Sequence, residues 1–234
     1  MAVRLLFPNY VFQYNLLETG HVTQNYLDLL VQDVEGQRKK DPVGRRISNA
    51  SSGWQSYDGT ERRHVFGKLV RIINEIHNGE FSQFFDHQGV SFKMGNMWTN
   101  INDNGAWNRP HLHNGCYYSG VFYIKADGDE GDFCAIDKDC QVVADFPPSV
   151  RSPNSWNFSP TSGSLLLFPS GLMHMVEPNF TDKDRISVSW NMTHEFNAQQ
   201  QGFGWYPHTR DRKEWAHSQD ELVFNLDENG KLVR

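Results

Sequence analysis

The second half of the chain consists of short strand-like segments separated by turns, and this pattern restricts the possible folds more than any other feature. Runs of β-branched and aromatic residues recur at 91–102, 117–124, 132–136, 163–169 and 185–191. Pieces rich in Gly, Pro, Asp and Asn separate them, including "KADGDEGD", "DFPPSV" and "EPNFTDKD". Short strands at such spacing are typical of a barrel or a double-sheet jelly roll.

Two amphipathic helices are expected ahead of this β-rich region. In the first, apolar residues recur at i, i+3, i+4 and i+7, and Thr23 is placed to act as the N-cap. The second apolar stripe is followed by Gly79, a helix stop. Both helices should pack on one outer face, whereas 41–60, rich in Gly, Ser, Asn and Asp, is predicted to be an irregular loop. The two stripes are Leu27, Leu30, Val31 and Val34, and Val65, Leu69, Ile72, Ile73 and Ile76.

These elements predict a single domain over residues 1–234 that is mainly β with flanking helices. Residues 1–85 would supply an N-terminal strand and the two supporting helices, and 90–195 the jelly-roll core. Residues 196–234 would form a C-terminal extension.

Charge and cysteine content narrow the class of protein. The net charge is −6, which argues against a nucleic-acid partner because such proteins normally present a basic face. Cys116, Cys134 and Cys140 form no CxxC pair, so neither a disulfide framework nor a zinc knuckle is expected. There is no secretory signal pattern and no run of about 20 apolar residues, so we expect a cytoplasmic protein without a membrane span.

Three histidines are candidate metal ligands. His111 and His113 are two residues apart, directly before the strand-like run at 117–124, and side chains at i and i+2 of a strand share a face. His174 follows the apolar strand 163–169 after a Pro-Ser-Gly break. Imidazoles so placed can close on one metal ion, although the His-x-His pair is equally compatible with two polar loop residues.

The segment "RISVSWN" at 185–191 alternates between polar and apolar residues. Arg185 and Ser187 fall on one face of the expected strand, and the apolar residues fall on the other. An Arg fork matches a carboxylate bidentately, and a hydroxyl two residues on can donate to the same group. The strand could therefore hold a ligand carboxylate inside a barrel, or it could be an ordinary strand with one solvated face.

Three ordered motifs resemble a known family. "HLHNGCYYSGVFYI", "LFPSGLMHMVEPN" and "RISVSWN" are similar to segments of the iron(II)- and 2-oxoglutarate-dependent dioxygenases, in particular a bacterial and phage branch. With "SNASSGWQS" and "NMWTNIN", the resemblance covers about residues 48–192. It implies a double-stranded β-helix (jelly-roll, cupin-like) fold and a hydroxylase that uses Fe(II) and 2-oxoglutarate. The substrate would be a peptide, an amino acid or a small molecule, with succinate and CO2 as co-products.

The resemblance also implies residue roles. His174 takes the position of the distal metal ligand, and Arg185 and Ser187 take those of the 2-oxoglutarate-binding pair. Tyr123, with the strand parity of the paired histidines, and Asn100, on a neighbouring strand, are further candidates for contact with 2-oxoglutarate.

The proximal ligand pair departs from the family pattern. Most members carry His-x-Asp or His-x-Glu, giving two histidines and one carboxylate on iron, whereas His111 is followed by His113. Three histidines could bind the ion together, which is the favoured reading. Alternatively, His113 could be the only ligand of the pair, as in halogenase-like members, or Asp127 or Asp129 could reach the metal.

Two other classes of function fit part of the pattern. Three histidines also describe a zinc hydrolase or lyase with an activated water. A cupin-like module that binds a metal or ligand without turnover is the other alternative. The zinc chemistry does not require Arg185 and Ser187 to face inward. Trp98 is interpreted as a packing aromatic.

Overall fold

The structure, a computed structural model, describes residues 9–84, 90–137, 155–196, 225–226 and 232–233. Its contacts divide the chain into two units, Tyr10–Glu195 and a unit made of Met1–Asn9 with Phe196–Arg234. In the second unit, the described strands β12 (Asn225–Leu226) and β13 (Leu232–Val233) pair antiparallel. The start of the predicted N-terminal strand, Cys140 and most of the C-terminal extension lie outside the described residues.

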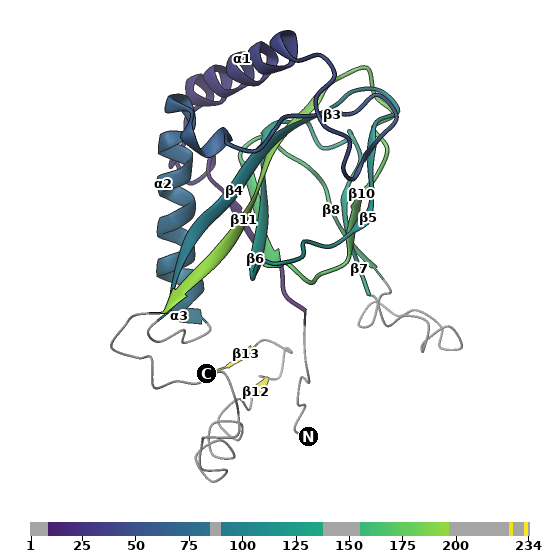
Figure 1. Cartoon of the computed structure of the whole chain (residues 1–234). Helices are drawn as coiled ribbons and strands as arrows, with labels where there is room; N and C mark the ends of the chain where they lie inside the picture. The colour runs from purple at the N-terminus through teal and green to yellow at the C-terminus, as the bar shows by residue number, and fades with distance from the viewer. Residues whose placement is uncertain (1–8, 85–89, 138–154, 197–224, 227–231, 234) are drawn as a thin grey trace, which may run out of the picture. The chain divides into compact units, whose positions relative to one another are not determined.

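Two antiparallel sheets face one another in the unit Tyr10–Glu195 (Figure 1). The larger sheet has the order β1-β9-β6-β11-β4-β3, and the smaller has the order β2-β5-β10-β7-β8. The large-sheet strands are β1 (Phe12–Asn15), β9 (Ser164–Pro169), β6 (Tyr118–Lys125), β11 (Arg185–Phe196), β4 (Val90–Asn102) and β3 (Trp54–Gln55). The small-sheet strands are β2 (Asn49–Ala50), β5 (Trp107–His111), β10 (His174–Val176), β7 (Phe133–Ile136) and β8 (Ser155–Phe158). This is a double-sheet jelly roll, and the predicted class is confirmed.

The two long helices cover the outer face of the large sheet, as predicted (Figure 1). The helix α1 (Gln24–Lys40) begins at Thr23, whose side chain accepts a hydrogen bond from the backbone N–H of Tyr26. Two 3-10 turns, η1 (Thr60–Arg62) and η2 (His64–Phe66), lead into α2 (Gly67–Ile76). A wide turn, η3 (His77–Phe81), and the short α3 (Ser82–Phe84) follow, with a break in helical geometry at Gly79.

Strand β11 separates the two layers of the core. Ile186, Val188 and Trp190 pack with the helices, whereas Arg185 and Ser187 face the space between the sheets. The alternation predicted for residues 185–191 is therefore confirmed. On the neighbouring strand, Gly120 lies opposite Trp190, and a Cβ atom there would clash with the indole ring. Only glycine leaves room for this buried indole.

Two sequence predictions are wrong. The segment 41–60 is not wholly irregular, because it contains β2 and β3, which pair with β5 and β4. Both strands have two residues, too few for an alternating pattern. Nor do the paired histidines share a strand face: His111 ends β5, whereas His113 follows the strand and its backbone N–H donates to the Ser170 carbonyl.

No helix in the described ranges is long and apolar enough to cross a membrane.

His77 is a fully buried histidine in the layer beneath the helices. Its ring packs among Phe81, Phe92 and Tyr118, and its Nε2 lies 3.5 Å from the indole nitrogen of Trp190. Its Nδ1 has no hydrogen-bond partner among the described residues. Burial lowers the pKa of His77 to about 3, so the ring is neutral in the folded protein at neutral pH.

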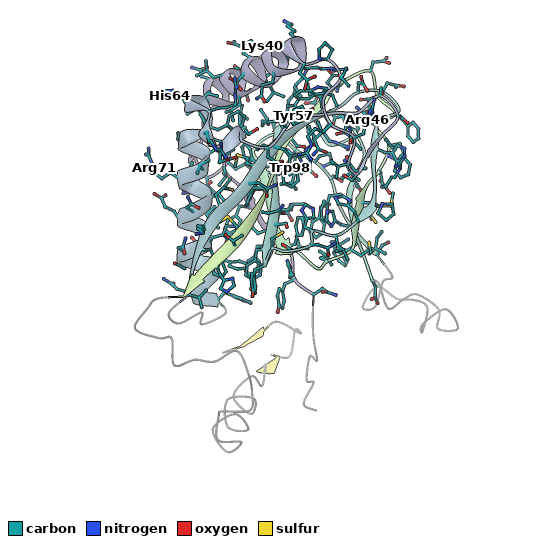
Figure 2. The ribbon with its side chains drawn as sticks, in the orientation of Figure 1. Lys40, Arg46, Tyr57, His64, Arg71 and Trp98 are labelled. Carbon is teal, nitrogen blue, oxygen red and sulfur yellow. The ribbon has the colours of Figure 1, made fainter. Side chains whose placement is uncertain are left out.

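We expect His77 to make the protein sensitive to acid. Below pH 6.5, His77 is protonated in the unfolded chain but stays neutral in the folded chain. The free energy of unfolding therefore falls as the pH falls from 6.5 toward 3. The loss from this residue is about 2 kcal/mol at pH 5. Denaturant unfolding at pH 7.5 and 5 should show a smaller loss in His77→Leu than in the wild type. The exposed His64 (Figure 2) is the control, because His64→Leu should keep the wild-type loss. Equal losses in all three proteins would contradict the prediction.

Candidate metal and cosubstrate site

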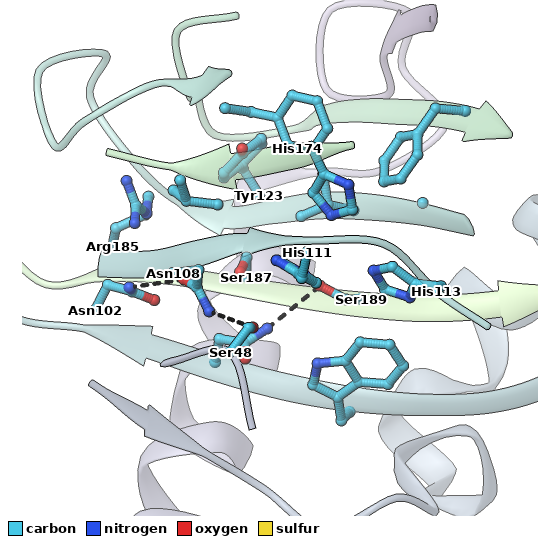
Figure 3. A pocket seen from close by; sticks show the side chains of 17 residues that line it. Ser48, Asn102, Asn108, His111, His113, Tyr123, His174, Arg185, Ser187 and Ser189 are labelled. Carbon is cyan, nitrogen blue, oxygen red and sulfur yellow. Dashed lines mark hydrogen bonds between the residues drawn. The ribbon is translucent and has the colours of Figure 1, made fainter. Parts of the chain in front are cut away.

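A pocket between the two sheets collects the side chains singled out from the sequence (Figure 3). Its walls come from β4, β6, β9 and β11 of the large sheet and β5, β7 and β10 of the small sheet. In Figure 3, Arg185 lies at one end of the pocket and His113 at the other. The predicted residues that line it are His111, His113, Tyr123, His174, Arg185, Ser187 and Asn100.

Three histidines converge at one end of this pocket. One ligand nitrogen from each of His111, His113 and His174 lies within 4.8 Å of the other two. Strand pairing brings them together, because His174 at the start of β10 lies directly opposite His111 at the end of β5. Among the described residues, these three histidines are the only cluster of side chains that could hold a metal ion. Asp127 is exposed and binds Lys183, and neither Asp127 nor Asp129 lines the pocket.

Each histidine has a hydrogen-bond acceptor at Nδ1. The backbone carbonyls of Arg109 and Leu172 lie 2.6 Å and 2.9 Å from Nδ1 of His111 and His174. Because a carbonyl only accepts, Nδ1 carries the proton in both rings and Nε2 keeps its lone pair. Both rings are therefore held as ligands that present Nε2.

A side chain plays the same part for His113. The Asn191 amide oxygen lies 2.6 Å from Nδ1 of His113 and also accepts from the Ser119 hydroxyl at 2.8 Å. The Asn191 amide nitrogen donates to the Asn96 side chain at 2.9 Å, which fixes the orientation of the amide. The Nε2 atom of His113 is thus also left with a lone pair.

The three rings are neutral at neutral pH. Burial, followed by repulsion from His111, lowers the pKa of His113 to about 4 and that of His174 to about 3. Burial also lowers the pKa of His111. Aromatic rings close the site on one side: Phe133 and Phe168 lie 5.0 Å and 4.9 Å from the His174 ring. Neutral imidazoles are the form that binds a divalent metal.

Arg185 is a buried cation at the far end of the pocket. Its side chain is 2% exposed, and burial lowers the pKa of its guanidinium. Nη1 donates to the carbonyls of Glu130 and Gly131, whereas Nη2 is buried and has no partner among the described residues. A buried donor without a partner is costly, so this one is a candidate to bind an acidic ligand.

Three predicted polar residues lie between the two ends. Ser187 on β11 is directly opposite Tyr123 on β6, which explains why both face the pocket. Shared parity with His111 does not explain the position of Tyr123, because the two residues belong to different sheets. Burial raises the pKa of Tyr123 to about 12, which keeps its hydroxyl protonated. Asn100 on β4 donates to the Ser189 hydroxyl at 3.3 Å.

Trp98, Ser48 and Asn108 also line the pocket and were not identified as site residues from the sequence. Trp98 is more than a packing residue, because its ring stacks on His113 at 5.7 Å and 25°. Asn108 and His111 both reach the pocket despite their odd spacing, because a β-bulge interrupts the pairing of β5 with β10. Alternation along β4 could have identified Trp98, since it lies two residues before Asn100.

A wider cleft adjoins the histidine end of the pocket. It has a volume of about 230 Å³, against about 50 Å³ for the pocket, and the two share Ser48, Trp98, His111 and His113. Arg45 and Asp58 form an ion pair at 3.4 Å in the cleft wall. The rings of His111 and His113 are therefore accessible from the side opposite Arg185, whereas His174 is buried.

The central segment of the chain is similar in sequence to a known family. Residues 96–191 match the model of a family described as "Putative 2OG-Fe(II) oxygenase". This segment holds the three histidines, Arg185 and Ser187. The match confirms the predicted resemblance, the enzyme class of 2-oxoglutarate- and Fe(II)-dependent oxygenases, and the cofactors of that class. No curated protein matches the chain in sequence.

Solved structures share the fold at low sequence identity. A prolyl-4-hydroxylase from Pseudomonas putida has a TM-score of 0.55 at 16% identity, over 79% of this chain and 93% of that one. HygX from Streptomyces hygroscopicus, solved with nickel, 2-oxoglutarate and hygromycin B, has a TM-score of 0.53 at 13% identity, over 79% and 83%. A prolyl hydroxylase from Trichoplax adhaerens, in complex with a peptide fragment of hypoxia inducible factor, has 0.54 at 11%, over 84% and 87%. These likenesses confirm the double-stranded β-helix.

Proposed function

We propose that the protein hydroxylates a C–H bond of a peptide, amino-acid or small-molecule substrate, with His111, His113 and His174 holding Fe(II). Arg185 and Ser187 would bind the far carboxylate of 2-oxoglutarate. One observation carries the proposal: a pocket has three convergent neutral imidazoles at one end and a buried guanidinium with an unpartnered N–H at the other. A dianionic cosubstrate that chelates a metal at one end and ends in a carboxylate fits both.

The donor set fits a divalent iron. Imidazole nitrogen is a suitable ligand for Fe(II), and three neutral ligands leave the positive charge of the metal for an anionic cosubstrate to balance. The hydrogen bonds to Nδ1 hold each ring in the required tautomer. The family pattern places a carboxylate where His113 stands, so this ligand set depends more than usual on the charge of the cosubstrate.

The chain itself would bind, orient and exclude water. When bound, Fe(II) and 2-oxoglutarate supply the oxidising chemistry, which consumes O2 and releases succinate and CO2. Arg185 orients the cosubstrate from the far end, because its Nη1 is fixed by two carbonyls and its Nη2 is available. Trp98 covers one face of the His113 ring and Phe133 one face of the His174 ring, which limits access of water from those sides.

The wider cleft is the proposed entry for the substrate, because it alone of the two cavities is lined by exposed residues such as Ile47 and Leu112. Structural relatives were solved with a peptide fragment and with hygromycin B bound, and we propose a substrate of one of these two chemical classes. We expect neither a nucleic-acid nor a membrane partner, and we place the protein in the cytoplasm.

Succinate formation tests this proposal. Protein loaded anaerobically with Fe(II) and then mixed with 2-oxoglutarate and air should release succinate slowly without any substrate. A library of peptides and small molecules should contain compounds that accelerate the release. Succinate that forms at the rate of free Fe(II) in buffer, in every condition, would refute the proposed activity.

The histidine pair provides a sharper test of the ligand set. Because the three rings converge, we expect His111→Ala to weaken Fe(II) binding by more than about 100-fold, beyond the usual cost of losing a residue that only supports a ligand. In His113→Asp, a carboxylate at the family position should still bind iron and retain some 2-oxoglutarate decarboxylation. Anaerobic iron titration measures both. Unchanged iron binding in His111→Ala would show that His113 is the only ligand of the pair.

A further inference from the structure

The turn between β6 and β7 crosses from the large sheet to the small one at the Arg185 end of the pocket. Gly131 in this turn has φ +89°, and a Cβ atom there would lie 2.5 Å from the Glu177 carbonyl. The turn is therefore packed tightly against the connection between β10 and β11, and only glycine fits there. The backbone conformation of the turn before Gly131 depends on Glu130.

Glu130 is a buried carboxylate that the proposed mechanism does not use. Its side chain is 1% exposed, and both carboxylate oxygens accept from the backbone N–H of Asp127 at 3.0 Å. One of them also accepts from the N–H of Gly128 at 3.1 Å. All of these bonds join the carboxylate to the backbone of its own turn. Such charge-assisted bonds hold a turn in one conformation.

The same turn holds Arg185 through its backbone. The carbonyl oxygen of Glu130 lies 2.5 Å from Nη1 of Arg185, and that of Gly131 lies 2.6 Å from the same atom. These two bonds fix one branch of the guanidinium and leave Nη2 buried without a partner. The direction in which Nη2 points is thus set by the turn that the Glu130 carboxylate closes.

We propose that Glu130 is a positioning residue for the 2-oxoglutarate site. Glu130 holds the β6–β7 turn in the conformation that directs Nη2 of Arg185 toward the far carboxylate of 2-oxoglutarate. The inference rests on the proposed function. Glu130 would touch neither the metal nor the cosubstrate. Its loss should therefore weaken recognition of the far carboxylate specifically, while the histidines keep their metal.

The test compares two ligands that differ only at the far end. 2-Oxopentanoate has the five carbons and the keto acid of 2-oxoglutarate but no second carboxylate. Both are titrated anaerobically into manganese-loaded wild type, Glu130→Gln and Asp127→Asn. Asp127 is the matched control on the same turn, because its side chain is exposed and forms an ion pair with Lys183, while its backbone N–H remains in the variant.

We expect Glu130→Gln to weaken 2-oxoglutarate binding by about 10- to 100-fold, since the bonds to the far carboxylate are charge-assisted and depend on geometry. Manganese and 2-oxopentanoate affinities should change less than about 2-fold, below the effect of even one weak hydrogen bond. Asp127→Asn should bind all three ligands like the wild type. In Arg185→Leu, adding Glu130→Gln should weaken 2-oxoglutarate no further.

Three outcomes would overturn the inference. The first is wild-type affinity for 2-oxoglutarate in Glu130→Gln, and the second is an equal loss for both ligands, as expected of general damage. If Glu130→Gln does not fold, Glu130→Asp replaces it, because Asp keeps the charge on a shorter side chain. Glu130→Asp should show the same selective loss of 2-oxoglutarate affinity by a smaller factor. The third contradicting outcome is that Glu130→Asp shows no such selective loss. Wild type that binds no 2-oxoglutarate would instead refute the proposed function, and this inference with it.

Discussion

His174→Ala should abolish Fe(II) binding and 2-oxoglutarate turnover while the jelly roll stays folded. The His174 ring lies 4.2 Å from that of His111 and 5.2 Å from that of His113 between ring centroids. Removing one of three proposed ligands should lower the metal affinity by more than about 100-fold. That figure is the upper end of the loss seen when a residue that only hydrogen-bonds to a ligand is removed. Anaerobic iron titration measures the affinity, and circular dichroism checks the fold.

His194→Ala is the matched control for this experiment. His194 lies on β11, where its ring packs edge-on against Tyr117 at 4.1 Å, and it does not line the pocket. The control should bind Fe(II) like the wild type. Wild-type iron stoichiometry in a folded His174→Ala would show that this histidine is not a ligand.

Arg185→Leu should leave the metal affinity unchanged and greatly weaken 2-oxoglutarate. Removing one partner of a buried, hydrogen-bonded charge pair costs roughly 3–5 kcal/mol, or on the order of 100- to 1000-fold or more in affinity. Arg185→Lys should be intermediate, because an ammonium keeps the charge and loses the fork. Isothermal titration of 2-oxoglutarate into anaerobic, manganese-loaded protein measures the affinity.

An exposed arginine serves as the comparison. Arg71 lies on the outer surface of α2 (Figure 2), and Arg71→Leu should change stability by no more than about 0.5 kcal/mol and affect no ligand. If Arg185→Leu behaved in the same way, Arg185 would have no role in cosubstrate binding. The three-histidine cluster would then fit a zinc hydrolase or a metal-binding module better.

Parts of the fold and site with a regular period could be predicted from the sequence. Strand β11 alternates strictly, so its pocket face, with Arg185 and Ser187, followed from the period of two. The two long helices followed from apolar stripes of period 3.6 and from the Thr23 cap. These signals are local, so one sequence was enough to find them.

Other parts depend on tertiary contacts that leave no local pattern. The bulge in β5 turns Asn108 and His111 toward one pocket, and nothing in "WNRPH" marks it. Glu130 looked like one acid in a polar turn, because its role depends on Arg185, which is 55 residues away in the sequence. The pairing of His111 with His174 is likewise a matter of strand register.

The most direct measurement of the central claim is the anaerobic absorption spectrum of the protein with Fe(II) and 2-oxoglutarate. If the three histidines hold Fe(II) and the cosubstrate chelates it, a visible charge-transfer band should appear only when protein, iron and 2-oxoglutarate are all present. The band should be lost in His174→Ala. In Arg185→Leu it should require a much higher concentration of 2-oxoglutarate. A protein that retains zinc, or binds iron, and shows no band at saturating 2-oxoglutarate would contradict the account.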